Sequence, residues 1–155
     1  MIDLETIDPM YMVFGNIFTT ANQLQVILDQ EMEEITAKQF YALIMLDIFE
    51  DAPTLKELAE QSGTSHQNMK QIILKLQHKG YIEIRPDRKD KRAMRIYKTD
   101  LTEELSKKYD ANSKIFMKEL FSCLSKDETA KLSEYLIRIS QQMRKMKEAN
   151  NGKED

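Results

Sequence analysis

The sequence has little of what several classes of protein require. Its 155 residues include a single cysteine, Cys123, so the chain can form no internal disulfide and no cysteine-rich zinc site. Two histidines offer few ligands for a metal ion, and we find no nucleophile–base pair and no phosphate-binding loop. Four glycines and three prolines are few for the many tight turns of a β-sandwich or barrel. These shortages predict a protein that is not an enzyme and that needs no cofactor or metal.

The sequence also gives no sign of a membrane or an export route. No stretch approaches the roughly 20 apolar residues of a membrane helix, and residues 1–5 are acidic, unlike the start of a secretory signal. Hydrophobic residues make up 41% and charged residues 32%, which is the composition of a folded, water-soluble chain. We expect a cytoplasmic protein without membrane contact.

The net charge of −3 conceals a strong asymmetry along the chain. Residues 1–63 carry two basic and twelve acidic side chains, whereas residues 64–98 carry ten basic and three acidic ones. A short, strongly basic block inside an acidic chain is a candidate surface for a polyanion such as DNA. The alternative is an ordinary solvated basic face, and charge alone does not decide between the two.

Helical periodicity dominates the first part of the chain. Apolar residues recur at three- and four-residue steps over residues 9–30, which predicts a first helix. The capping boxes Thr36-Ala-Lys-Gln39 and Thr54-Leu-Lys-Glu57 predict the starts of two more helices. We expect the first of these to end at residues 51–53 and the second, a short one, to stop at Ser62-Gly63.

A helix-turn-helix and a hairpin follow. Residues 64–79 read as a further helix with an apolar stripe, and Gly80 is its C-terminal stop. Two helices joined by a three- or four-residue turn with glycine form a helix-turn-helix. Residues 81–85 and 93–97 alternate apolar and polar side chains, so they predict two strands joined by the charged loop 86–91. A helix-turn-helix followed by a charged hairpin is a winged helix.

The remainder of the chain is predicted to be helical. One helix starts at Asp100 or Thr102, and the capping box Ser125-Lys-Asp-Glu128 opens another.

Three pieces of the sequence carry a family resemblance. They are Leu58-Ala59, Leu76-Gln-His-Lys-Gly80-Tyr-Ile, and the wing Arg85-Pro-Asp-Arg-Lys-Asp90-Lys-Arg92-Ala93. Over about residues 9–147 the chain resembles the MarR (multiple antibiotic resistance regulator) family of bacterial transcription factors, whose wing reads R-x-D-x-x-D-x-R-A. Gln71 stands where the family often has arginine, and Leu74 where it often has a polar residue, so the operator sequence cannot be transferred.

The resemblance implies a mainly α fold with a small β-hairpin wing, in which a winged helix-turn-helix is flanked by N- and C-terminal dimerisation helices. The long apolar stripes at both ends of the chain suit pairing with a second subunit. The expected segments are a dimerisation helix over residues 1–32, the DNA-binding domain over 33–98, C-terminal dimerisation helices over 99–147 and a disordered tail over 148–155.

The second helix of the helix-turn-helix is the expected recognition helix. With Met69, Ile72, Ile73 and Leu76 turned inward, Gln67 and Gln71 point outward and Asn68 flanks them. Glutamine and asparagine can pair bidentately with adenine, so these three are the candidate base-reading residues. The alternative is a polar face turned to solvent. The DNA-binding candidates on this segment are Ser65, His66, Gln67, Asn68, Lys70, Gln71 and Lys75.

The wing supplies a second set of candidates, all cationic: Arg85, Arg88, Lys89, Lys91 and Arg92. A guanidinium suits a narrow minor groove because the potential there is strongly negative. By resemblance, Arg92 contacts the groove or braces the wing, and Asp90 positions it across the loop. A carboxylate would repel phosphate, so bracing is the physical role open to Asp90. The alternative is an ordinary charged hairpin.

We interpret the chain as a sequence-specific transcriptional regulator, a homodimeric repressor whose partners are double-stranded DNA and a second copy of itself. The resemblance also implies release from DNA by a small aromatic effector. The alternative is a winged-helix module that binds protein; six basic residues between Arg85 and Arg95 favour DNA instead. Cys123, beside Phe121 and Leu124, is interpreted as a buried packing residue.

Overall fold

The structure is a computed structural model that describes residues 7–88 and 90–151. These residues form α1 (Pro9–Glu31), α2 (Ala37–Leu46), α3 (Leu55–Gln61), α4 (His66–His78), β1 (Ile82–Pro86), β2 (Met94–Lys98), α5 (Asp100–Leu120) and α6 (Lys126–Asn151). The predicted mainly α fold with a small hairpin is confirmed. α6 continues to Asn151, past the residue where we expected the tail to begin, and residues 152–155 lie outside the described ranges. Within those ranges no helix combines the length and apolar character needed to cross a bilayer.

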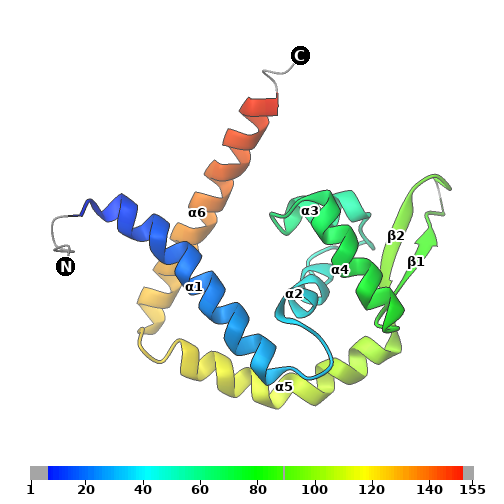
Figure 1. Cartoon of the computed structure of the whole chain (residues 1–155), viewed down its shortest axis with the longest axis horizontal. Helices are drawn as coiled ribbons and strands as arrows, with labels where there is room; N and C mark the ends of the chain where they lie inside the picture. Colours follow the sequence, from blue (N-terminus) through cyan, green and yellow to red (C-terminus); the bar gives the residue numbers. More distant parts are fainter. Residues whose placement is uncertain (1–6, 89, 152–155) are drawn as a thin grey trace. The chain divides into compact units, whose positions relative to one another are not determined.

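The chain divides into two compact units, residues 1–105 and residues 106–155, and the long helix α5 belongs to both. In the first unit, α2, α3 and α4 pack together, with the β1–β2 hairpin beside them (Figure 1). The core of the described residues lies in this unit, where Leu58, Met69, Ile73 and Leu76 are almost completely buried. Burial therefore holds the helix-turn-helix and the base of the wing in one packed body.

Helix starts follow the local sequence closely. The predicted capping boxes at Thr36 and Thr54 are confirmed: each hydroxyl accepts from a main-chain N–H three residues on, and Gln39 and Glu57 reach back to the cap N–H. The predicted end of α2 at residues 51–53 is wrong, because α2 stops at Leu46.

The residues after α2 leave the helix to pair with the hairpin. The carbonyl of Pro53 accepts from the N–H of Ile96 at 2.9 Å, and Thr54 forms an isolated bridge with Arg95. A helix that continued to the predicted end at residues 51–53 would withdraw Pro53 from this pairing with β2. Non-local pairing therefore decides where α2 ends.

The hairpin pairs β1 and β2 antiparallel, with Ile84 opposite Ile96 and Arg85 opposite Arg95. Both strands start one residue later than predicted. Tyr81 is still part of the helix stop: its N–H donates to the carbonyl of Leu76 at 3.0 Å, and Gly80 takes a φ of +82°. That left-handed conformation favours glycine, so the predicted stop at Gly80 is confirmed.

The helices near the two ends carry large apolar side chains that the single chain leaves exposed. Neither α1 nor α6 buries any side chain among the described residues. The exposed residues of α1 are Met10, Tyr11, Val13, Phe14, Ile17, Phe18, Val26 and Ile27, and those of α6 are Leu132, Tyr135, Leu136, Ile137, Met143 and Met146. Cys123, which we interpreted as buried, is also exposed in the single chain.

Candidate nucleic-acid interface

The expected recognition helix, α4, has one buried face and one polar face. Met69, Ile73 and Leu76 are buried and Ile72 is half-buried, so the predicted inward face is confirmed. All the remaining candidates on this segment are exposed, namely Ser65, His66, Gln67, Asn68, Lys70, Gln71 and Lys75. The structure thus brings these seven residues together along one helix and its N-cap.

Two of these residues also hold the start of α4. Ser65 is the N-cap, and its hydroxyl accepts from the N–H of Asn68 at 3.1 Å. The amide of Asn68 donates to the hydroxyl of Thr64 at 2.7 Å, so this side chain is already oriented before any ligand arrives. Gln67 and Gln71 project from the exposed face without such a constraint in the structure. They are therefore the amides best placed to meet a base edge.

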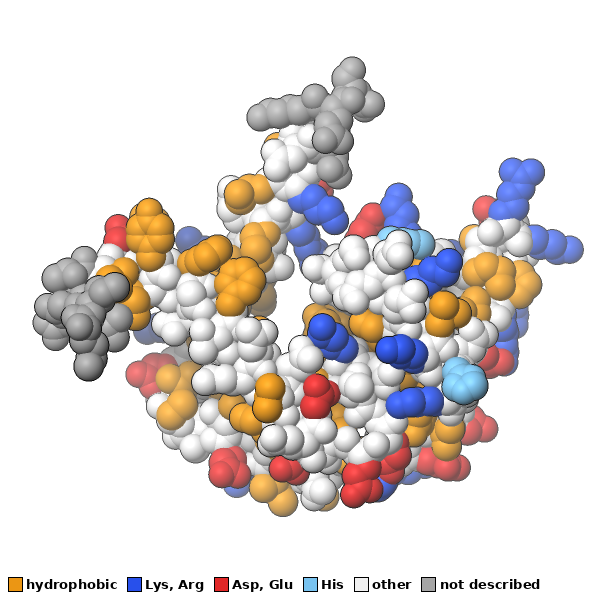
Figure 2. Space-filling view, in the orientation of Figure 1, with side chains coloured by type: hydrophobic (Ala, Val, Ile, Leu, Met, Phe, Trp, Pro, Cys, Tyr) orange, Lys and Arg blue, Asp and Glu red, His pale blue; other side chains and the backbone are white. Residues whose placement is uncertain are grey.

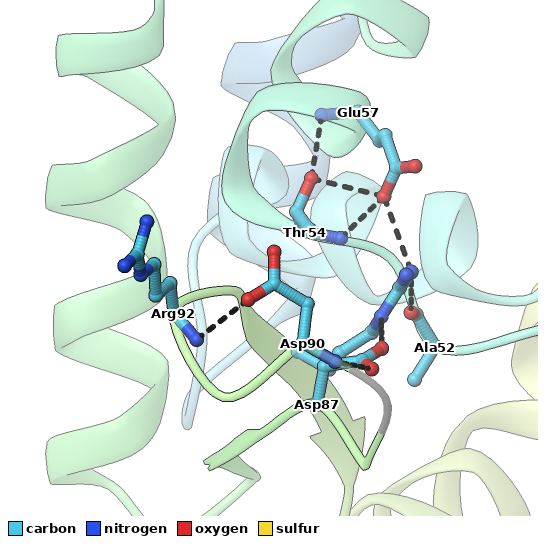
Figure 3. A network of polar contacts seen from close by, with 7 residues as sticks. Ala52, Thr54, Glu57, Asp87, Asp90 and Arg92 are labelled. Carbon is cyan, nitrogen blue, oxygen red and sulfur yellow. Dashed lines mark hydrogen bonds and ion pairs between the residues drawn. The ribbon is translucent and has the colours of Figure 1, made fainter.

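The wing loop is held by two carboxylates. Asp87 accepts from the N–H of Asp90 at 2.9 Å, and Asp90 accepts from the N–H of Arg92 at 3.0 Å (Figure 3). The carbonyl of Asp90 also accepts from the N–H of Ala93. Asp90 thus contacts the main chain of Arg92 and orders the turn from which the Arg92 side chain projects. The carboxylate acts on Arg92 through the backbone.

The cations of the basic block divide into two groups. Four are engaged by the chain itself: Arg85 with Glu83, Arg95 with Asp87 and Glu57, Lys98 with Asp47, and Lys79 with the carbonyl of Glu34 and the amide of Gln39. Within the described residues, Lys70, Lys75, Arg88, Lys91 and Arg92 are exposed and form no ion pair. Lys89 lies outside the described residues. The cations left for a polyanion are therefore those of α4 and the wing tip.

Arg85, a predicted DNA-binding residue, is one of the engaged cations. Besides its ion pair with Glu83, its guanidinium lies over the ring of Tyr97, 5.3 Å from the centroid. Its charge is partly matched on the strand itself, so we expect it to contribute less to phosphate binding than Arg88 or Arg92.

In the space-filling view, Lys and Arg side chains (blue) gather over α4 and at the wing (Figure 2). The acidic groups of the same unit that are visible in this view lie mainly along its lower edge. This separation of charge within one packed body creates a positive face on an acidic protein.

Sequence reasoning missed a network at the base of the wing. Arg95 donates from Nε to Asp87 Oδ2 at 2.5 Å, and from Nη1 to the carbonyl of Ala52 at 2.9 Å and to Glu57 Oε2 at 3.4 Å. Hydrogen bonds from the main-chain N–H and the hydroxyl of Thr54 hold the pKa of the Glu57 carboxyl below its ordinary value, and the positive charge of Arg95 also lowers it. The capping box identified Glu57, but nothing in the sequence links it to an arginine 38 residues away.

Comparison with known proteins supports the same architecture. The model of the MarR family matches residues 34–93, which run from just before α2, through the helix-turn-helix of α3 and α4, to the end of the wing loop. No curated protein sequence matches the chain.

Three solved structures are similar to the chain at low sequence identity. A MarR protein from Peptoclostridium difficile has a TM-score of 0.79 and 19% identity, covering 94% of this chain and 95% of its own. The PcaV transcriptional regulator from Streptomyces coelicolor, solved with its natural ligand, has a TM-score of 0.72 and 20% identity, covering 91% and 96%. The MepR–DNA complex from S. aureus has a TM-score of 0.71 and 19% identity, covering 82% and 93%.

These structures share the fold of most of the chain, and the family model matches the sequence of residues 34–93. The chain is thus similar to MarR-family regulators in that segment and in its fold.

Proposed function

We propose that this chain is a sequence-specific DNA-binding transcription regulator that acts as a homodimer and represses genes next to a pseudo-palindromic operator. The observation that carries the proposal is the exposed polar face of α4 beside wing-tip cations that no carboxylate of the described residues neutralises. An α-helix fits the major groove, where base edges present distinct hydrogen-bond patterns. Such a regulator works in the cytoplasm and is not an enzyme.

The two sets of residues have different tasks in this proposal. Gln67, Asn68 and Gln71 read bases, while the remaining candidates contact phosphates or the minor groove: Ser65, His66, Lys70, Lys75, Arg85, Arg88, Lys89, Lys91 and Arg92. Asp90 braces the turn that presents Arg92. Phosphate contacts fix the position of the protein on the duplex, and base contacts select the sequence.

The homodimer rests on the apolar faces of the end helices. Phe14 of α1 is 65% exposed, and Met143 of α6 is 56% exposed, although both are large apolar side chains on long helices. Soluble monomers rarely expose contiguous apolar surface of this extent, so a second copy is the natural cover. Residues 1–32 and 99–147 are therefore the proposed dimerisation segments, around a DNA-binding domain over 33–98.

Release by a small aromatic effector is the part of the proposal that depends on the family alone. The Streptomyces coelicolor regulator is solved with its natural ligand. An effector can lower DNA affinity only as far as it prefers the dimer shape that does not bind DNA. Loss of operator binding in the presence of aromatic acids tests this step.

The experiment that tests DNA recognition compares one base-reading variant with one phosphate-binding variant. Arg88→Ala should weaken binding to every duplex alike and lower the salt slope by about one unit for a lost phosphate contact. Gln71→Ala should leave the salt slope nearly unchanged. It should relax discrimination at one base pair per half-site by about 1–3 kcal/mol if the contact is bidentate.

Salt titrations of each variant with a selected operator and with a scrambled duplex give both quantities. If Gln71→Ala weakens both duplexes equally while Arg88→Ala changes sequence preference, the assignment of α4 to bases and the wing to the backbone is wrong. Binding of neither duplex by the unaltered protein would leave the protein-binding winged helix as the better reading.

A further inference from the structure

We propose that Arg95 is the residue that positions the wing for DNA, by joining the hairpin to the first turn of α3 through Glu57 and to the wing loop through Asp87. The proposal deepens the DNA-binding function above and rests on it. Arg95 is a positioning residue, because its guanidinium faces the protein and the wing tip carries the cations proposed to meet DNA.

The contacts of Arg95 join three separate parts of the chain. Asp87 belongs to the beginning of the wing loop, Ala52 to the connection between α2 and α3, and Glu57 to the first turn of α3. Figure 3 shows Ala52, Thr54 and Glu57 on one side of this network and Asp87 and Asp90 on the other. A single side chain therefore crosses the junction between the helices and the wing.

The chemistry of arginine suits this junction. A guanidinium presents its donors in a rigid planar fork, so it can serve a carboxylate from Nε and two further acceptors from Nη1 at once. An ammonium group at the same place would keep the charge but would not reproduce this set of directed contacts. The position thus requires arginine for its geometry as well as for its charge.

The main chain supports the same attachment. The N–H of Ile96 donates to the carbonyl of Pro53, and Thr54 bridges to Arg95 itself. At the far end of β2, Lys98 forms an ion pair with Asp47, the residue that caps α2. The strand β2 is therefore held at both ends. The wing loop leads into β2 at the end that Arg95 holds.

Arg95 and its neighbour Arg85 differ in whether their ion pairs join separate elements of the fold. The two residues lie opposite each other in the hairpin, and each is paired with a carboxylate. The partner of Arg85 is Glu83, two residues away on the same strand, so that pair joins no separate elements. The side chain of Arg95 is 27% exposed against 59% for Arg85. Arg85 is thus a matched control with the same charge at the same level of the wing.

Fixing the wing matters for DNA because α3 packs on α4. A wing joined to α3 keeps its tip at a set position relative to the recognition helix, and a preorganised surface loses less conformational freedom on binding. When the junction is loosened, the tip cations remain but must be ordered as DNA binds. The expected signature is weaker binding with an unchanged count of phosphate contacts.

The first test follows the wing in the free protein. Arg88, Lys91 and Arg92 are trypsin sites in the exposed loop, so the rate of cleavage there reports how often the loop leaves its folded conformation. Arg95→Leu should raise this rate by about tenfold, the effect of losing a hydrogen-bonded charge contact. Arg85→Leu should be cleaved at the rate of the unaltered protein. Equal rates for the two variants would overturn the proposal.

The second test measures DNA binding with charge held constant. Arg95→Lys should weaken binding by about fivefold with an unchanged salt slope, because charge and phosphate contacts are kept while the fork is lost. As the control, Lys56→Arg changes an exposed ion pair within α3 and should bind as the unaltered protein does. Binding by Arg95→Lys at the unaltered affinity would refute the positioning role.

The two readouts also separate this proposal from the function on which it rests. The cleavage assay needs no DNA. If the chain shows the expected cleavage pattern but binds no duplex, Arg95 still positions the wing and the proposed DNA-binding function is wrong. A thermal melt of each variant checks folding. If Arg95→Leu does not fold, Arg95→Lys and Glu57→Gln carry the cleavage comparison, since glutamine can still accept from Thr54 without the charge that meets Arg95.

Discussion

Replacing Phe14 and Phe18 by alanine should dissociate the proposed homodimer. The two rings lie on α1 with centroids 5.2 Å apart in an edge-to-face arrangement, and their exposed fractions are 65% and 60%. A phenylalanine offers about 200 Å² of surface, so together they expose roughly 250 Å² that a second copy can cover.

The magnitude follows from this area. If the second copy covers half of it, the two substitutions remove about 3 kcal/mol per chain at about 25 cal/mol per Å². Both chains of the dimer carry the change, so about 6 kcal/mol is lost in all, which raises the dimer Kd by a factor on the order of 10⁴. Alanine keeps the helix intact because it has the highest helix propensity.

Sedimentation equilibrium over a range of protein concentrations measures this Kd. The control is Ile48→Ala, since Ile48 is 57% exposed but follows α2, outside the proposed dimerisation segments. The control should remain dimeric while the double variant becomes monomeric. A double variant with the Kd of the unaltered protein, or an unaltered protein that is itself monomeric at micromolar concentration, would refute the reasoning.

Three further predictions concern the packed first unit and two helix caps. Leu58→Ala should lower the free energy of unfolding by about 2–5 kcal/mol, because Leu58 is 0% exposed; a loss below that range in urea denaturation would mean that the site collapses around the cavity. Gly80→Ala should cost about 1–2 kcal/mol in the same assay, since φ is +82° and the nearest contact, Leu101 Cδ2 at 3.7 Å, leaves room for a Cβ; an unchanged stability would show that the backbone relaxes. Hydrogen bonds from the caps hold the pKa values of the Glu57 and Glu128 carboxyls below the ordinary value of glutamate, so their stabilisation is present above that ordinary value and is lost as pH falls through the lowered ones. Glu128→Gln should flatten the acid side of the stability profile, and a profile as steep as before would exclude this cap as a cause.

The features that the sequence predicted well are local ones. A capping box such as Thr54-Leu-Lys-Glu57 places its donors and acceptors within one turn, and the stop at Gly80 depends on one backbone conformation. Alternation over a few residues was also enough to find the two strands to within one residue. These signals need no knowledge of the rest of the fold.

The features that it missed depend on distant parts of the chain or on a second chain. α2 ends early because Pro53 pairs with Ile96, and the Arg95 network joins residues 38 positions apart. The apolar neighbours Phe121 and Leu124 suggested that Cys123 is buried, but the sequence could not tell whether the same chain covers it. The structure was also needed to show which of the ten basic residues in the 64–98 block are engaged by other groups of the chain and which described ones are exposed without an ion pair.

In vitro selection from a random double-stranded DNA library tests the central claim, sequence-specific DNA binding by a symmetric dimer, most directly. We expect the purified chain to enrich a pseudo-palindromic site whose half-sites lie about one helical turn, roughly 34–36 Å, apart. The selected site should bind at least about 10³-fold more tightly than a scrambled duplex at physiological salt. A selection that enriches no common sequence, or an enriched duplex bound no better than its scrambled form, would contradict the account.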